Sequence, residues 1–305
     1  MMSVTARAFP TQLMGERRWL AGLWRVLFYA IGPTEPFRFR TRDYEMFAVP
    51  QKWHLSRSVI RKGSWESYIT DVFRSHLRPG LTVVDVGANY GHYALTAANA
   101  VGRDGLVLAF EPQPVVFTDL RRNASLLPHH NLQVFAMALG DTNGDAVLAV
   151  DTTTSGWSSL VAELVPSPGD SITVPVRRLG DVLAEVAPSR KVGLMKIDVE
   201  GFEAQVFRGA WDVLERDRPV VFTEFSLTRI RRAGEDAGAL LERLFALGYQ
   251  ASLIDEKNSR LVPASLPVED WATRYGAHLN NVETGDWFVN MVLEAKSPAE
   301  VEREA

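Results

Sequence analysis

The chain has 305 residues, of which 46% are hydrophobic, enough for one large domain with a sizeable buried core. Its formal net charge of −4 argues against nucleic acid as a partner, because phosphate binding usually leaves a basic footprint. It contains no cysteine, which excludes disulfides, zinc–thiolate sites and cysteine nucleophiles. We expect a cytoplasmic protein from this composition.

The first 63 residues are expected to form an extension outside the main domain. Residues 19–31 are strongly apolar, but the run is short and Arg25 interrupts it, whereas a spanning helix needs about 20 apolar residues. We interpret 1–63 as a lid or an oligomerisation segment, with a homodimer as one outcome. The alternatives for 19–31 are peripheral contact with a membrane surface and an export signal or anchor.

Strands and helices alternate after this extension. Helices are expected at 64–77, 91–101, 114–126, 202–216 and 236–247. Strands are expected at 81–86, 106–110, 132–138, 145–150, 171–178, 194–198, 220–224, 250–254 and 286–293. This order predicts an α/β fold with a doubly wound, mostly parallel sheet over residues 64–295, followed by a flexible charged tail at 296–305. Ligands of such sheets bind outside the carboxyl ends of the strands.

The run from Val83 to Tyr93 is a short apolar strand, a turn bounded by glycines and the start of a helix. Backbone N–H groups at a helix N-terminus can hold an anionic group. A dinucleotide fingerprint reads G-x-G-x-x-G, and its second glycine lets the pyrophosphate approach. Asn89 stands at that position here. The turn therefore favours a smaller ligand with a carboxylate and a ribose, and S-adenosylmethionine is the candidate.

Acidic and polar residues around this turn could contact such a ligand. Glu111 ends the second strand, where a carboxylate can accept both ribose hydroxyls; the alternative is a solvated acid that caps the next helix. Asp85 could hold the turn or reach the ligand's ammonium group through water. Asn89 and Tyr90 would line the amino-acid end. His92 either faces the site or is a surface histidine.

A second cluster of acids follows the strand at 194–198. Asp198, Glu200 and Glu203 lie within six residues at the expected cleft edge, and Glu224 ends the next strand. Carboxylates held close together raise one another's pKa, as is common in active sites; the alternative is that Glu200 and Glu203 only favour the next helix N-terminus. A divalent metal is conceivable, but the spacing does not predict one.

The loop containing residues 156–160, Gly-Trp-Ser-Ser-Leu, connects two expected strands. Long loops of this kind are often lids or binding loops, and the alternative is an exposed connection.

These segments, in this order, resemble the FkbM-type family of S-adenosylmethionine-dependent methyltransferases. The stretches that carry the resemblance are 81–93 (LTVVDVGANYGHY), 110–112 (FEP), 138–141 (ALGD), 178–183 (RLGDVL), 196–203 (KIDVEGFE) and 220–224 (VVFTE). The resemblance covers about residues 64–255. Phe202 stands where many members have histidine, which weakens any proposal of a histidine base there.

The resemblance implies a Rossmann-like, class I methyltransferase sheet of seven strands, the last antiparallel. It implies contacts of the cofactor's methionine part with Asp85, Gly87, Asn89 and Gly91, of the ribose with Glu111, and of adenine with Ala138 and Leu139. Neighbouring residues complete the expected cofactor site: Ala88, Tyr90, Tyr93, Pro112 and Asp198.

The predicted reaction is O-methyl transfer to a hydroxyl or carboxyl group of a small-molecule acceptor, such as a natural product or a sugar. Asp198 and Glu200 are the first candidates for a general base, followed by His92 and Glu224, while Asp198 could instead contact the cofactor. One alternative is an NAD(P)-dependent oxidoreductase, which Asn89 argues against. Another is a non-catalytic partner-binding protein that retains the fold, which the intact acids argue against.

Overall fold

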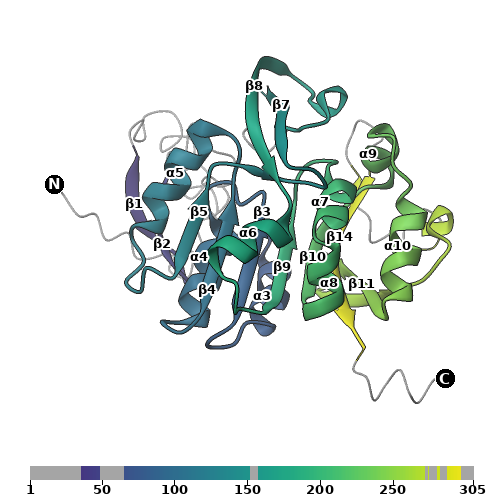
Figure 1. Ribbon diagram of the computed structural model, residues 1–305. Coiled ribbons are helices and arrows are strands. Elements are labelled where there is room, and N and C mark those ends of the chain that lie inside the picture. Colours follow the sequence, from purple (N-terminus) through teal and green to yellow (C-terminus); the bar gives the residue numbers. More distant parts are fainter. Residues whose placement is uncertain are drawn as a thin grey trace, which may run out of the picture.

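A central mixed sheet organises the protein (Figure 1). The computed structural model describes residues 36–48, 65–151, 157–271, 274, 280–281 and 287–296. The strands of the sheet are, in spatial order, β12 (Arg260–Ala264), β11 (Tyr249–Asp255), β14 (Trp287–Ala295), β10 (Val220–Phe225), β9 (Val192–Ile197), β3 (Thr82–Val86), β4 (Leu106–Phe110) and β5 (Leu132–Phe135), with β13 (Asn280–Asn281) paired to β14. The predicted α/β sheet is therefore confirmed.

The directions of the strands also match the expectation. Strands β5, β4, β3, β9 and β10 are parallel neighbours, and β14 is antiparallel to both β10 and β11. The predicted strand at 286–293 is thus the antiparallel one. Strand β12 adds an antiparallel edge beyond the seven expected strands.

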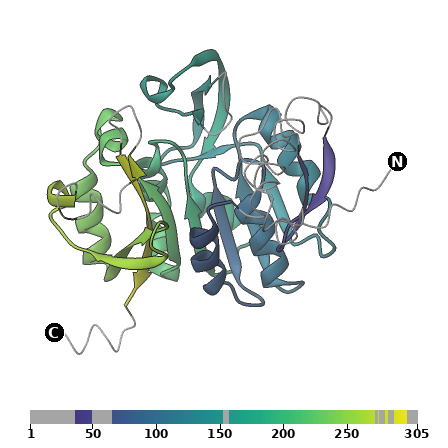
Figure 2. The ribbon, with the colours of Figure 1, turned by 180° about the vertical axis from the view of Figure 1, so that it is seen from behind.

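Helices cover both faces of the sheet, which explains why its inner strands are continuous apolar runs (Figures 1 and 2). One layer contains α3 (Ser67–Ser75), α4 (His92–Val101) and α5 (Pro114–Ala124). The other contains α6 (Leu179–Val186), α7 (Glu203–Gly209), α8 (Trp211–Asp217), α9 (Leu227–Arg232) and α10 (Ala237–Ala246), with the short turn η4 (Val268–Asp270) against α10.

Local sequence signals set most of these helix boundaries. Helix α5 starts with a proline at its first position, and the Asp236 carboxylate caps α10 by accepting from the Ala239 N–H at 3.0 Å. The predicted helix at 202–216 is two helices, α7 and α8. They meet at Gly209, where a Cβ atom would lie 1.8 Å from the carbonyl oxygen of Gly140. This close contact between backbones accounts for a small residue at the junction.

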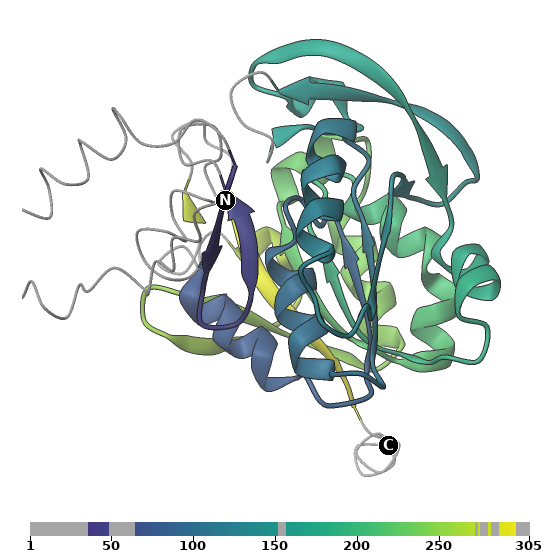
Figure 3. The ribbon, with the colours of Figure 1, turned by 90° about the vertical axis from the view of Figure 1, so that its left-hand side faces the viewer.

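A hairpin of β1 (Phe37–Arg40) and β2 (Glu45–Ala48) lies beside α5, as Figure 3 shows. Its Phe-Arg-Phe-Arg alternation is a strand signal, although we did not predict a strand here. The N–H of Phe47 donates to the Asn123 side chain at 2.7 Å, which anchors the hairpin to α5.

Residues 19–31, for which we predicted a lid, oligomerisation or membrane-surface segment, lie outside the described residues. The tail from residue 297 onward does too. Among the helices that the structure does describe, none is both long enough and apolar enough to cross a membrane.

A second, three-stranded sheet rises above the carboxyl ends of the central strands (Figure 1). It consists of β6 (Ala138–Leu139), β8 (Pro168–Arg177) and β7 (Gly144–Asp151), in that order, with the 3-10 turn η3 (Ala162–Leu164) between β7 and β8. We call residues 138–151 and 157–177 the arm. The strands predicted at 145–150 and 171–178 are present in the arm and do not extend the central sheet. The strand predicted at 132–138 ends at Phe135, before the chain enters the arm.

Candidate functional site

The turn between β3 and α4 has the tight, left-handed backbone that its glycines predicted. Gly87, Asn89 and Gly91 all have positive φ, at 78°, 51° and 97°. The N–H groups of Gly87 and Ala88 both donate to the Phe110 carbonyl at 3.0 Å, which ties the turn to the end of β4. A Cβ atom on Gly87 would lie 1.9 Å from the Asp198 carbonyl oxygen, so only glycine fits there.

Glu111 is held beside this turn by two backbone donors. Its Oε2 accepts from the Asn89 N–H at 3.0 Å, and its Oε1 accepts from the Gln113 N–H at 2.9 Å. The residue is only 8% exposed, so the alternative of a solvated strand-end acid is wrong. Burial raises the pKa of Glu111 to about 7, although the two N–H donors oppose the shift. Each oxygen keeps acceptor capacity for a ligand hydroxyl.

A pocket opens at the carboxyl ends of the strands, between the turn, Glu111 and the arm. The predicted residues that line it are Gly87, Asn89, Glu111, Pro112, Ala138, Leu139, Asp198 and Glu200. Residues that we did not predict to line it are Val86, Phe110, Leu148, Val199 and Phe202. Ser158, Ser159 and Leu160 complete the wall, which favours the binding-loop interpretation of 156–160 over an exposed connection.

The remaining predicted site residues do not line this pocket. They are Asp85, Ala88, Tyr90, Gly91, His92, Tyr93 and Glu224. Gly91 begins α4, and the carbonyl of Tyr90 accepts from the Asn123 side chain at 2.9 Å, so these two residues shape the turn from behind.

Asp85 and Tyr93 belong to a buried charged network on the α3 and α4 side of the sheet. Its centre is Lys196, whose Nζ lies 2.9 Å from Asp198 Oδ2 and 5.1 Å from the centre of the Tyr93 ring. The Tyr93 hydroxyl donates to Glu66 at 2.7 Å. Burial acts to lower the pKa of Lys196, but the nearby carboxylates of Asp198 and Glu66 outweigh it, so the pKa is raised and the ammonium stays charged.

Asp85 lies beside Lys196 across paired strands and is 2% exposed. Burial raises its pKa to about 7, against the pull of the Lys196 charge, and its Oδ2 has no hydrogen-bond partner among the described residues. A buried carboxylate oxygen in this state suits a cationic or hydrogen-bond-donating ligand group, directly or through water.

His92 is not a surface residue, which corrects one of the two expectations for it. It is 4% exposed, with Nδ1 2.6 Å from the Tyr44 hydroxyl and Nε2 2.8 Å from Thr70 Oγ1. Because the Thr70 hydroxyl already donates to the Trp65 carbonyl, Nε2 carries the proton and Nδ1 accepts from Tyr44. Burial lowers the pKa of His92 to about 3. Both nitrogens are occupied away from the pocket, so this geometry gives no support to the general-base role.

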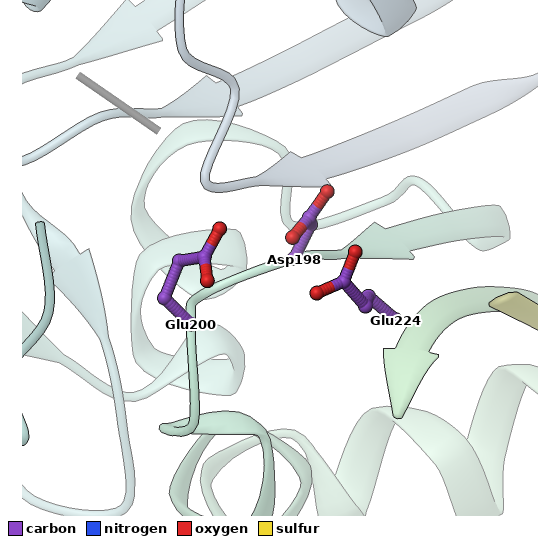
Figure 4. A group of neighbouring side chains, drawn as sticks. All are labelled: Asp198, Glu200 and Glu224. Atoms are coloured by element: carbon purple, nitrogen blue, oxygen red, sulfur yellow. The ribbon is translucent and has the colours of Figure 1, made fainter. Parts of the chain in front are cut away.

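Three acids from neighbouring strand ends converge, as Figure 4 shows. Asp198 and Glu200 follow β9, and Glu224 lies in β10; one oxygen from each lies within 4.8 Å of the others. The guanidinium of Arg229 binds Glu200 and lies 3.4 Å from Glu224 Oε1. Burial raises the pKa of both glutamates and their mutual repulsion adds to the shift of Glu224, while Arg229 lowers both. We call Asp198, Glu200 and Glu224 the acid trio.

The acid loop, residues 198–201, is held in a strained conformation. Glu200 has a positive φ of 55°, unusual for a residue with a long side chain, and Gly201 follows at 102°. Glu203 Oε1 accepts from the N–H groups of Val199 and Gly201, at 3.2 and 3.1 Å. Glu203 is therefore the support of the loop. The alternative that we gave for it, a favourable charge at a helix N-terminus, is compatible with its place at the start of α7.

The acid trio is spaced closely enough to share a divalent cation. However, Lys196 already pairs with Asp198, and Arg229 with both glutamates. The negative charges of the acid trio are therefore neutralised by the side chains of Lys196 and Arg229, without a metal ion. Neither Lys196 nor Arg229 was among our predicted site residues. The position of Lys196 inside an apolar strand could have indicated a buried functional charge. Arg229 lies in a separate helix, α9, and nothing in the sequence around it indicates a contact with the acids.

Comparison with known proteins shows that the chain is similar to methyltransferases. The profile of the Methyltransferase FkbM domain matches residues 85–251. Methyltransferase 1 of Beauveria bassiana is 31% identical over 153 residues, which are 44% of this chain and 61% of that protein. The 31-O-demethyl-FK506 methyltransferase FkbM of Streptomyces tacrolimicus is 34% identical over 167 residues, 45% of this chain and 62% of that protein. The methyltransferase sdnD of Sordaria araneosa is 30% identical over 225 residues, 62% and 84% of the two chains.

The chain thus spans about three fifths of the first two relatives. Solved structures with a related fold include a methyltransferase FkbM from Methylobacillus flagellatus KT, with 12% identity, a TM-score of 0.40 and coverage of 80% of this chain and 56% of that one. Aeropyrum pernix fibrillarin, with bound S-adenosyl-L-methionine, has 12% identity, a TM-score of 0.41 and coverage of 88% and 86%. Likenesses this distant say nothing about what this chain binds.

Proposed function

The chain belongs to the FkbM methyltransferase family, and from this premise we propose that it transfers a methyl group from S-adenosylmethionine to an oxygen of a small-molecule acceptor. The observation that carries the proposal is the geometry of Glu111. This buried carboxylate is oriented by two backbone donors at the edge of a pocket and faces a turn that admits no side chain at Gly87.

The residues present fit the cofactor's chemical groups. Glu111 would accept the two ribose hydroxyls, and Ala138 and Leu139 line the pocket where the adenine would lie. Asp85 does not line the pocket, so its unpartnered Oδ2 would reach the cationic amino-acid end through water. When bound, S-adenosylmethionine supplies an electrophilic methyl group on a sulfonium centre. The protein would contribute position and a water-poor wall.

The two glutamates of the acid trio would take the acceptor proton. Burial raises the pKa values of Glu200 and Glu224, so in their ionised forms these carboxylates bind a proton more tightly than ordinary glutamates do. Asp198 is bound to Lys196 and lines the pocket, so we propose that it faces the cofactor and that the two glutamates receive the proton. The sequence analysis named Asp198 and Glu200 together as the first candidates for the general base, so this assignment of separate roles to the three acids is a further proposal.

Calorimetric titration tests the cofactor. We expect S-adenosylmethionine to bind at micromolar Kd and NAD not to bind, and we expect Glu111→Ala to lose affinity by about 100-fold or more, because two charge-assisted hydrogen bonds are removed. Glu185→Ala, an exposed glutamate of α6, is the matched control. Equal affinity of the Glu111 variant would refute the ribose role, and binding of NAD alone would support the oxidoreductase alternative.

The acceptor requires a separate experiment. A panel of sugar, macrolide and peptide acceptors, incubated with methyl-labelled S-adenosylmethionine, would identify the class that receives label. With a responsive acceptor, Glu200→Gln and Glu224→Gln should each lower kcat while leaving the cofactor Kd within about threefold. A variant with unchanged kcat would exclude its residue as the proton acceptor.

A further inference from the structure

Two adjacent serines of the arm line the pocket and connect its Glu111 side to the acid loop, which lines the same pocket. Ser158 lines the pocket, and its Oγ accepts from the Asp151 N–H at 3.1 Å. The Gln113 side-chain amide donates to the same Oγ at 3.5 Å. Ser158 is therefore connected to the segment that follows Glu111, on the cofactor side of the site.

Ser159 also lines the pocket, and it contacts the acid loop. It is 2% exposed, and its hydroxyl donates to the carbonyl oxygen of Glu200 at 2.9 Å. The same Oγ accepts from the Val161 N–H at 3.0 Å, and the backbone of Ser159 pairs with Ala149 of β7 through two hydrogen bonds of 3.0 and 3.1 Å. The hydroxyl is thus fixed to the arm before it reaches Glu200.

A second contact joins the arm to the acid loop. Leu164 of η3 packs over Gly201, where a Cβ atom would lie 2.2 Å from the Leu164 side chain. Glu200 and Gly201 are the two residues with positive φ in the acid loop. A positive φ at a glutamate persists only where surrounding contacts impose it. The arm supplies such contacts at both residues, through a hydrogen bond at one and packing at the other.

We propose that Ser159 is a positioning residue that fixes the Glu200 carboxylate within the acid trio, and that the Ser158–Ser159 pair couples the Glu111 side of the pocket to the acid trio. The proposal rests on the proposed function in assigning the trio to proton transfer. Without the Ser159 hydroxyl, the Glu200 carbonyl loses its donor and the acid loop can relax from its left-handed backbone. The Glu200 carboxylate would then leave the position where it meets Glu224 and Arg229.

Amide hydrogen exchange tests the positioning without any acceptor. In Ser159→Ala we expect exchange in the peptide 196–205 to accelerate by about fivefold or more, as the loss of one buried hydrogen bond predicts. Ser159→Thr keeps the hydroxyl and should restore most of the protection. Ser171→Ala, in an exposed part of β8, is the matched control and should leave this peptide unchanged. Leu164→Ala should also accelerate exchange in this peptide, because it removes the side chain that packs over Gly201.

The coupling is tested by adding S-adenosylmethionine. In the wild type, its binding should slow exchange in the peptide 196–205, and Ser158→Ala or Ser159→Ala should reduce that slowing. Unchanged exchange in Ser159→Ala, or acceleration spread evenly over the whole chain, would overturn the positioning role. Failure of the wild type to bind S-adenosylmethionine would refute the proposed function, while the cofactor-free exchange would still decide the role of Ser159.

Discussion

Gly87→Ala is the sharpest perturbation of this site, because the chain contains a matched control in Gly80. The two glycines have nearly the same φ, 78° and 80°. Alanine in the left-handed region costs about 1 kcal/mol of stability at either position. The positions differ in their neighbours: a Cβ at Gly87 would lie 1.9 Å from the Asp198 carbonyl oxygen, whereas nothing lies within 4 Å at Gly80.

Relief of that contact requires Asp198 to move. The contact is about 1.5 Å short of ordinary van der Waals separation, and the Asp198 N–H is itself bonded to the Val86 carbonyl at 3.0 Å. Overpacking of this kind costs about 1–3 kcal/mol beyond the backbone term. We therefore expect the free energy of unfolding to fall by about 2–4 kcal/mol in Gly87→Ala and by about 1 kcal/mol in Gly80→Ala.

Urea unfolding measures this difference, and calorimetry with S-adenosylmethionine measures its effect on the site. Gly87→Ala should lose at least tenfold in affinity, because the turn and the Asp198 backbone separate, whereas Gly80→Ala should bind like the wild type. Equal destabilisation by the two substitutions would show that the turn yields without displacing Asp198. Wild-type affinity in Gly87→Ala would show that the cofactor does not depend on this turn.

Three further outcomes are expected. The pKa values of Asp85 and Glu111 are about 7 in the folded protein, above their unfolded values of 3.8 and 4.5, so the folded state holds more protons between these values. The free energy of unfolding should therefore fall by about 1.1 kcal/mol per pH unit for each group between pH 5 and 7, and urea unfolding that shows rising stability over this range would contradict the shifts. S-adenosylmethionine should bind about tenfold more tightly at pH 8 than at pH 6 for each of these carboxyls that must be ionised in the complex. A flat calorimetric profile would argue that Asp85 does not meet the cofactor's cationic end and that Glu111 does not accept the ribose hydroxyls as a carboxylate. His92→Phe should lower stability by about 2–3 kcal/mol, because it strands the buried Tyr44 hydroxyl, but should leave the cofactor Kd within twofold; a large loss of affinity would return His92 to the site.

The sequence was most informative where the structure is determined locally. The turn at residues 87–91 requires glycines in left-handed backbone, and this requirement is visible in the residues themselves. The strand at 287–295 was predictable from its own pattern, whereas its antiparallel direction came from the family resemblance. The convergence of the acids after β9 and in β10 was predictable because strand ends of one sheet share an edge. These features account for the central sheet and for half of the pocket wall.

The remainder depends on contacts between distant segments. The arm strands have the same alternation as strands of the central sheet, so their pattern does not say which sheet they join. Nothing in the sequence around His92 indicates that its ring is hydrogen-bonded to Tyr44, 48 positions earlier. Arg229 reaches Glu200 from α9, the fourth element after β9. In each case the role of a segment or side chain depends on a contact with a distant part of the chain, and the local sequence does not identify that contact.

The place of β14 has a consequence for how the protein folds during synthesis. This strand lies between β10 and β11 and pairs with both, although it follows them in the sequence. Until residues 287–295 have left the ribosome, β10 and β11 lack the neighbour that they share, so one edge of each stays open to other chains. The strands that lead to the turn and to Glu111 precede β10 and β11 in the sequence. We therefore expect the edge next to Glu224 to be the part of the sheet that needs protection until translation passes β14.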